Sequence, residues 1–162
     1  MAKQLVLKDD TSRIEYIFIQ NSSLTTGAGL TGLVFNSAGL TAYYARTQGA
    51  AVAITLATQT VTGAFSSGGF VEVDATNMPG LYRFDPPNAA FATGVDKTVM
   101  LLKGATNMAP VTLEYQLVNF DPEAALATPT NITAGTITTT TTAGKRRPGV
   151  PTGSGRPRAS AP

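Results

Sequence analysis

The stretch VDATNMPGLYRFDPPNAAF, residues 73–91, packs a Met-Pro-Gly turn, an alternating run and a Pro-Pro pair into nineteen positions. With the residues just before it, FVEVDA (70–75) and LYRFD (81–85) alternate apolar and polar side chains, which predicts two strands. Between them, Pro79 presets φ and Gly80 supplies the positive φ that a type II turn requires. The stretch therefore predicts a β-hairpin.

The alternation also predicts which side chains of this hairpin are buried. Side chains of a strand point alternately to its two faces, so one set packs in the core and the other meets solvent. We expect Val71, Val73, Tyr82 and Phe84 to face the core, and Glu72, Asp74, Arg83 and Asp85 to face solvent.

The Pro-Pro pair predicts how the chain leaves this hairpin. Pro86 and Pro87 cannot donate ladder hydrogen bonds, so the strand ends there. The residues that follow, up to Gly94, are expected to form one helical turn or corner that passes the chain to another sheet.

Short segments rich in β-branched and aromatic residues recur along the chain, separated by Gly-rich or polar turns. Strands at eight-to-twelve-residue spacing, with abundant Gly and Pro, favour an all-β sandwich or barrel. In the last of them Val111, Leu113, Tyr115 and Leu117 share one face. The expected strands outside the first hairpin are 12–20, 33–36, 40–46, 51–58, 95–103 and 111–120.

The composition changes at Asp121. Residues 121–162 contain nine Thr between 128 and 142, then Pro, Gly and Arg with few apolar side chains, so they cannot bury a core of their own. We interpret the chain as an N-terminal segment (1–11), a sandwich domain (12–120) and a Thr/Pro/Arg-rich extended C-terminal arm (121–162). Residues 1–123 carry seven basic and ten acidic groups, a net charge of −3, whereas residues 124–162 carry five basic groups and no acid, a net charge of +5.

The arm contains the candidate partner-binding residues. Thr has a high β propensity, so the Thr run could form a strand against an exposed sheet edge of a partner. Its basic cluster has three open interpretations: a solubilising tail, a contact with an acidic protein surface, or a contact with nucleic acid, although no aromatic residue is interleaved for base stacking. The candidate residues are Thr136, Ile137, Thr138, Thr139, Thr140, Lys145, Arg146 and Arg147.

The sequence excludes several kinds of chemistry. It contains no His and no Cys, which removes Ser-His-Asp and Cys-His catalysis, His-ligated metals and disulfides. GAGLTG (27–32) matches the dinucleotide fingerprint literally, but a polar stretch precedes it and no helix is expected after it, so we interpret it as a loop. Glu72, Asp74 and Asp85 are interpreted as solvated charges rather than a carboxylate or calcium site. We expect no catalytic, cofactor-binding or metal-binding residue.

Three stretches carry a resemblance to a known family: IEYIFIQNSSLTTGAGLTGLVFNSAGLTAYYAR, GGFVEVDATNMPGLYRFDPPNAAFATG and VMLLKGATNMAPVTLEYQLV. The resemblance runs from about Ser12 to Val118 and covers about two thirds of the chain. They resemble a β-sandwich module of tailed-bacteriophage structural proteins, in particular the N-terminal docking domain of siphophage baseplate upper proteins. The resemblance implies an immunoglobulin-like antiparallel β-sandwich that binds other virion proteins and performs no chemistry. Fibre-type members continue into long stalks, whereas about forty residues follow the module here.

The resemblance leads to a functional expectation. We expect a non-enzymatic virion structural protein that docks on capsid, neck or tail subunits, as a decoration or attachment protein, with the arm clasping neighbours and with homo-oligomers in the particle. Nucleic acid is not an expected partner, since no aromatic residue is interleaved in the basic cluster. A membrane is not expected either, since no segment approaches the roughly 20 apolar residues that cross a bilayer. The location would be the virion, after synthesis in the host cytoplasm. The alternative is a receptor- or glycan-binding module of a tail fibre, which would use exposed aromatic side chains.

Overall fold

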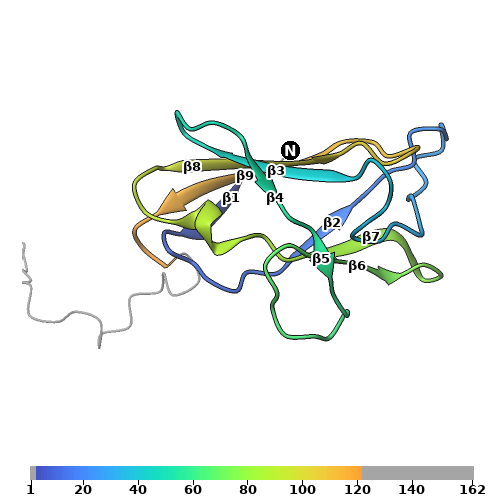
Figure 1. Cartoon of the computed structure of the whole chain (residues 1–162), viewed down its shortest axis with the longest axis horizontal. Helices are drawn as coiled ribbons and strands as arrows, with labels where there is room; N and C mark the ends of the chain where they lie inside the picture. The colour runs from blue at the N-terminus through green and yellow to red at the C-terminus, as the bar shows by residue number, and fades with distance from the viewer. Residues whose placement is uncertain (1–2, 122–162) are drawn as a thin grey trace, which may run out of the picture. The chain divides into compact units, whose positions relative to one another are not determined.

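The structure is a computed structural model that describes residues 3–121, and it is a β-sandwich of two packed sheets (Figure 1). One short 3₁₀ helix, η1 (Asn88–Phe91), joins the two layers. Sheet A contains, in spatial order, β1 (Gln4–Leu7), β9 (Val111–Val118), β8 (Lys97–Lys103), β3 (Thr41–Arg46) and β4 (Val52–Ile54). Sheet B contains β2 (Glu15–Phe18), β7 (Met78–Phe84), β6 (Gly69–Asp74) and β5 (Ala57–Thr58).

The strand order confirms the predicted sandwich. The neighbours β2-β7-β6 in sheet B and β9-β8-β3 in sheet A correspond to the B-E-D and G-F-C strands of an immunoglobulin-like sandwich. Two pairs are parallel, β1 with β9 and β5 with β6, so each sheet is mixed rather than wholly antiparallel. Because β1 belongs to sheet A, the sandwich begins upstream of residue 12, where the sequence analysis placed its start.

Most of the expected strands are confirmed, and two segments differ. Residues 33–36 are a loop in which Leu33 is buried and Val34 is exposed, so the strand predicted there is wrong. The segment 51–58 is two strands instead of one, because the chain crosses from sheet A to sheet B between Ile54 and Ala57. A continuous apolar run can therefore serve both sheets in turn.

The first predicted hairpin is confirmed, but its turn lies earlier than expected. The turn spans residues 75–77, where the Asp74 carboxylate accepts hydrogen bonds from the N–H groups of Thr76 (2.8 Å) and Asn77 (2.9 Å). Pro79 and Gly80 lie within β7. Gly80 has a positive φ of 83°, but it lies within β7, where its backbone contacts that of Gly29, and not in the turn.

The register of this hairpin corrects the predicted faces. Phe70 lies opposite Phe84 and Val71 opposite Arg83, so Phe70 shares the core face with Tyr82 and Phe84. The burial of Tyr82 and Phe84 is confirmed, since neither is exposed to solvent, whereas the inward placement of Val71 and Val73 is wrong: both are only partly buried. The ladder shifts register between Glu72 and Asp74, and this irregularity cannot be inferred from a period of two.

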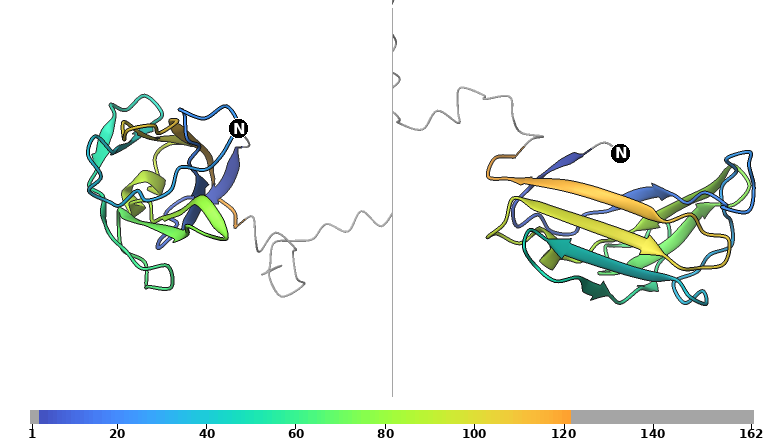
Figure 2. Two further views of the ribbon diagram at one scale, coloured as in Figure 1. Left: turned by 90° about the vertical axis from the view of Figure 1, so that its right-hand side faces the viewer. Right: turned by 90° about the horizontal axis from the view of Figure 1, so that it is seen from above.

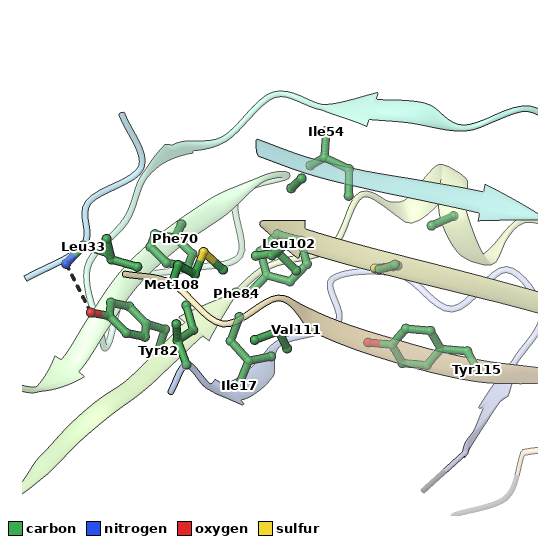
Figure 3. Packing of buried hydrophobic residues seen from close by; sticks show 14 of the residues in the cluster. Ile17, Leu33, Ile54, Phe70, Tyr82, Phe84, Leu102, Met108, Val111 and Tyr115 are labelled. Carbon is green, nitrogen blue, oxygen red and sulfur yellow. Dashed lines mark hydrogen bonds between the residues drawn. The ribbon is translucent and has the colours of Figure 1, made fainter. Parts of the chain in front are cut away.

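The core fills the space between the sheets (Figure 3). The rings of Phe70 and Tyr82 stack with centroids 4.9 Å apart, and those of Phe91 and Tyr115 meet edge to face at 5.2 Å. Phe91 comes from η1, so the predicted Pro-Pro corner both changes sheets and contributes to the core. Viewed from the right-hand side of Figure 1, the two sheets face each other (Figure 2, left).

Candidate interaction surfaces

The predicted partner-binding residues of the arm lie outside the described residues. Thr136, Ile137, Thr138, Thr139, Thr140, Lys145, Arg146 and Arg147 all follow residue 121.

The glycine-rich stretch 27–32 is a structural loop packed on β7. The Tyr82 hydroxyl donates to the carbonyl oxygen of Leu30 (2.7 Å) and accepts from the N–H of Leu33 (3.1 Å; Figure 3). Burial raises the pKa of Tyr82 to about 12, so its phenol stays protonated and keeps donating. No helix follows the loop in residues 33–40, and it therefore lacks the helix N-terminus that the dinucleotide fingerprint requires.

Two glycines hold this loop close to β7. A Cβ on Gly29 would lie 2.1 Å from the carbonyl oxygen of Pro79, and a Cβ on Gly80 would lie 2.4 Å from the Cα of Gly29. The two backbones thus touch where neither residue has a side chain. Gly29 and Gly80 serve this close approach, which explains the glycine at the third position of β7.

The three carboxylates weighed as a possible site do not come together. Glu72 accepts a hydrogen bond from the N–H of Gly32 (2.8 Å), and Asp74 closes the turn at 75–77. Asp85 lies elsewhere, against Arg83. Within residues 3–121 no cluster of acidic side chains is placed to hold a metal ion.

Arg83 and Asp85 form a buried ion pair, so their predicted exposure to solvent is wrong. Arg83 is 2% exposed and Asp85 is not exposed at all. The guanidinium donates two hydrogen bonds to the two carboxylate oxygens, Nε to Oδ1 and Nη2 to Oδ2, each at 2.8 Å. This bidentate geometry is the strong form of an Arg–carboxylate contact.

The loop at residues 59–66 covers this ion pair. Arg83 Nη1 donates to the carbonyl oxygens of Val61 (2.9 Å) and Gly63 (2.7 Å), while Asp85 Oδ2 accepts from Gln59 Nε2 (2.8 Å) and Ser66 N (3.0 Å). Arg83 points away from the core, as the alternation predicted. It is nevertheless buried because a loop folds over the outer face of sheet B.

The same contacts determine the ionisation of Asp85. Burial opposes its charged form, but the hydrogen bonds from Arg83, Ser66 and Gln59 outweigh burial and hold the pKa of Asp85 below its usual range. Both groups therefore stay charged at neutral pH, and the loop is fixed by an intact ion pair.

The other half of the outer face of sheet B is open. On and beside β2, the large apolar side chains of Ile14, Tyr16 and Phe18 are 40%, 57% and 51% exposed, and we call these three residues the β2 surface. Tyr16 lies opposite Arg83 and Phe18 opposite Leu81 in the β2–β7 ladder. Large apolar side chains exposed at three alternate positions, on one face of a strand, are a feature of interaction sites.

The outer face of sheet A has a smaller apolar strip. Tyr43 lies opposite Leu101, and Ala45 opposite Val99, where β3 and β8 form a groove of about 340 Å³ that Lys103 also lines. On β9 the face turns polar, because Thr112, Glu114 and Gln116 follow opposite Leu101, Val99 and Lys97. The aromatic β2 surface is therefore the stronger candidate for a protein contact.

Comparisons with family models, with curated proteins and with solved structures each find no match for this chain. No helix in residues 3–121 is long and apolar enough to span a bilayer. Functional inference consequently depends on the residues and surfaces themselves.

The β2 surface was not predicted from the sequence, because the strand expected at 12–20 was not divided into an inner and an outer face. The signal was present, since Ile14, Tyr16 and Phe18 alternate there with Arg13, Glu15 and Ile17. The buried set is Glu15, Ile17 and Ile19. Five of the six residues 14–19 are apolar, with Glu15 as the exception, so apolar side chains lie on both faces, which would suit a strand with a contact on each side.

Proposed function

We propose that this chain is a non-enzymatic structural protein of a tailed-bacteriophage virion, which docks on other virion proteins. The observation that carries the proposal is the β2 surface: three large apolar side chains stand in solvent on a sandwich whose core is already complete. A protein that acts by contact needs such a surface, since burying it on association contributes about 25 cal/mol per Å².

The sequence resemblance supports the kind of partner. The docking module that the chain resembles is an immunoglobulin-like sandwich, and the strand order here corresponds to one. Charge supports contacts between subunits as well, because residues 1–123 sum to −3 and residues 124–162 to +5. Within this proposal the arm clasps a neighbouring subunit.

Particle fractionation tests this function. Virions from a phage that encodes the chain would be purified and separated into heads and tails, and each fraction analysed by mass spectrometry. We expect the protein in one fraction at a copy number that matches a symmetric ring or lattice. Its absence from purified virions would refute the structural role.

A deletion tests the role of the arm. A chain ending at Glu123 should keep the sandwich but lose most of its incorporation into virions, because the clasp is gone. Circular dichroism provides the control for folding. Incorporation equal to that of the full chain would reduce the arm to a solubilising tail.

A receptor- or glycan-binding role is the second candidate, and Tyr16 and Tyr43 favour it because both are exposed aromatic side chains. A glycan array with the purified protein distinguishes the two functions. A specific sugar hit that is lost in Tyr16→Ser or Tyr43→Ser would support this candidate over docking alone.

A further inference from the structure

Strand β2 is an open edge of sheet B. Among residues 3–121, β7 is the strand that pairs with it, and no strand lies on its other side. The N–H of Ile19, just after β2, donates to the carbonyl oxygen of Gly80 at 2.8 Å. Because backbone groups of an antiparallel ladder alternate in direction, those of Tyr16 and Phe18 point away from β7. The edge thus offers backbone groups that no strand of residues 3–121 pairs with, beside two exposed aromatic rings.

Natural sandwiches protect such edges with charges, prolines or covering loops. Here the segment after β2 is covered, since Gln20 pairs with Gly29 and Asn21 with Met108. From Tyr16 to Phe18 the edge carries neither a charge nor a Pro, and no described loop covers it. This arrangement is suited to accept an added strand.

We propose that residues 136–140 of the arm of a second copy of this chain add to the β2 edge as a strand. The inference rests on the proposed function and specifies the surface that the arm clasps. The segment TITTT is five residues long, β-prone and free of Pro and Gly, so it is long enough to pair with the four residues of β2 and offers a complete set of backbone donors and acceptors. Ile137 supplies one apolar side chain to pack beside the aromatic rings.

The length and position of the arm favour this occupant. The last described residues follow β9, and the N–H of Lys8 donates to the carbonyl oxygen of Val118 at 2.8 Å, so the chain leaves the sandwich beside the end of β1 (Figure 2, right). Fourteen residues, 122–135, separate that point from the strand-forming segment and can span about 45 Å when extended.

The direction of pairing favours a second copy over the same chain. Residue 121 lies at the end of the sandwich at which β2 begins, because Ser12 N donates to Asn88 of η1 and Glu15 lies opposite Phe84. An arm that ran directly from there along its own β2 would pair parallel to it, whereas a copy related by a two-fold axis can deliver the arm antiparallel, the more stable pairing. The opposite net charges of residues 124–162 (+5) and 1–123 (−3) support such a contact.

Engineered cysteines test this contact directly, because the natural chain contains none. One preparation carries Thr138→Cys and another carries Tyr16→Cys; the two are mixed and oxidised with copper phenanthroline. We expect a disulfide between the two chains in at least about tenfold higher yield than with Tyr43→Cys, the control on the outer face of sheet A. Equal yields at Tyr16 and Tyr43 would overturn the proposal. So would a disulfide that forms only when both cysteines are in one chain.

Sedimentation equilibrium with the full chain provides a second measurement. Thr138→Pro removes a backbone donor from the arm without touching the sandwich, and Tyr16→Ser with Phe18→Ser removes the rings from the edge. Each change should weaken self-association about tenfold, while Tyr43→Ser should leave it unchanged. A chain that stays monomeric, or a dimer that ignores both changes, would contradict the inference.

These measurements use purified protein and are independent of virion incorporation. If the cross-link fails while incorporation still depends on the arm, the structural role stands and the β2 edge is the wrong surface. If the cross-link forms but the protein is absent from virions, the arm does bind the β2 edge and the proposed structural role is wrong.

Discussion

The outer face of sheet B has two halves, of which one is covered by a loop and the other is exposed to solvent. Around Arg83 the loop at 59–66 covers the face and turns a charged residue into a buried one. Around Tyr16 and Phe18 no described segment covers it, and aromatic residues stand in solvent. The halves are neighbours, since Tyr16 lies directly opposite Arg83 in the ladder. The comparison teaches that the side on which a strand residue points does not determine its burial; what lies over the sheet does.

The buried inner face of β7 provides the stability change with which the effects on both halves are compared. Phe84 is completely buried, so Phe84→Ala should lower the free energy of unfolding by about 3–5 kcal/mol through the cavity it leaves. Urea unfolding of the full chain measures this. A loss below about 1 kcal/mol would mean that the inner face of β7 is not packed as described.

On the covered half, Arg83→Met should cost nearly as much as Phe84→Ala. The change leaves Asp85 as a buried charge without its ion-pair partner, and loss of one such partner typically costs about 3–5 kcal/mol. The control is Lys97→Met, an exposed cation on sheet A, which should change stability by less than about 0.5 kcal/mol. Adding Asp85→Leu to Arg83→Met should recover part of the loss. Equal effects of Arg83→Met and Lys97→Met would show that the loop does not bury the pair.

Low pH should reduce the contribution of the Arg83–Asp85 ion pair to the free energy of unfolding. Because the pKa of Asp85 is lower in the folded state than in the unfolded chain, its ionised form contributes stability above the unfolded value of about 3.9, and this contribution disappears as the pH falls through the folded pKa. The stability difference between the wild type and Arg83→Met should therefore shrink when urea unfolding is repeated from pH 6 down to pH 2. A difference that stays constant over this range would contradict an ionised Asp85.

On the open half the expected effect on stability is the smallest. Tyr16→Ser combined with Phe18→Ser removes two rings that are already more than half in solvent, so the free energy of unfolding should fall by no more than about 1 kcal/mol. A loss as large as that of Arg83→Met would mean that these rings support the fold and are not free for a partner.

Several features of the fold could be predicted because they depend on short-range rules. The alternation in 81–85 predicted the burial of Tyr82 and Phe84, and Pro86 with Pro87 predicted the corner that became η1. The strands at 40–46, 95–103 and 111–120 follow from β-branched and aromatic residues between turns. Each of these signals lies within a few residues of the element it specifies.

The errors occurred where distant segments meet. Nothing near Arg83 in the sequence shows that a loop twenty residues earlier supplies its hydrogen bonds. Gly80 was assigned to a turn because its contact with Gly29 is fifty-one residues away in the chain, and only the packed structure brings their backbones together. The phase of β6 was inverted because alternation separates two faces without showing which one meets the other sheet; Phe70, opposite Phe84, is on the inner face and Val71, opposite Arg83, is on the outer face.

By itself, then, the sequence determined that this chain forms an all-β sandwich without His or Cys chemistry, followed by a basic, Thr-rich segment of opposite charge. Alternation, turn residues and composition act locally, so they can be read from the chain. The tertiary structure decided which outward side chains are buried and which stay in solvent, because a loop covers Arg83 and none of the described chain covers Tyr16 and Phe18. Burial depends on whatever packs over a residue, and that contact forms only when the two sheets and their loops have come together.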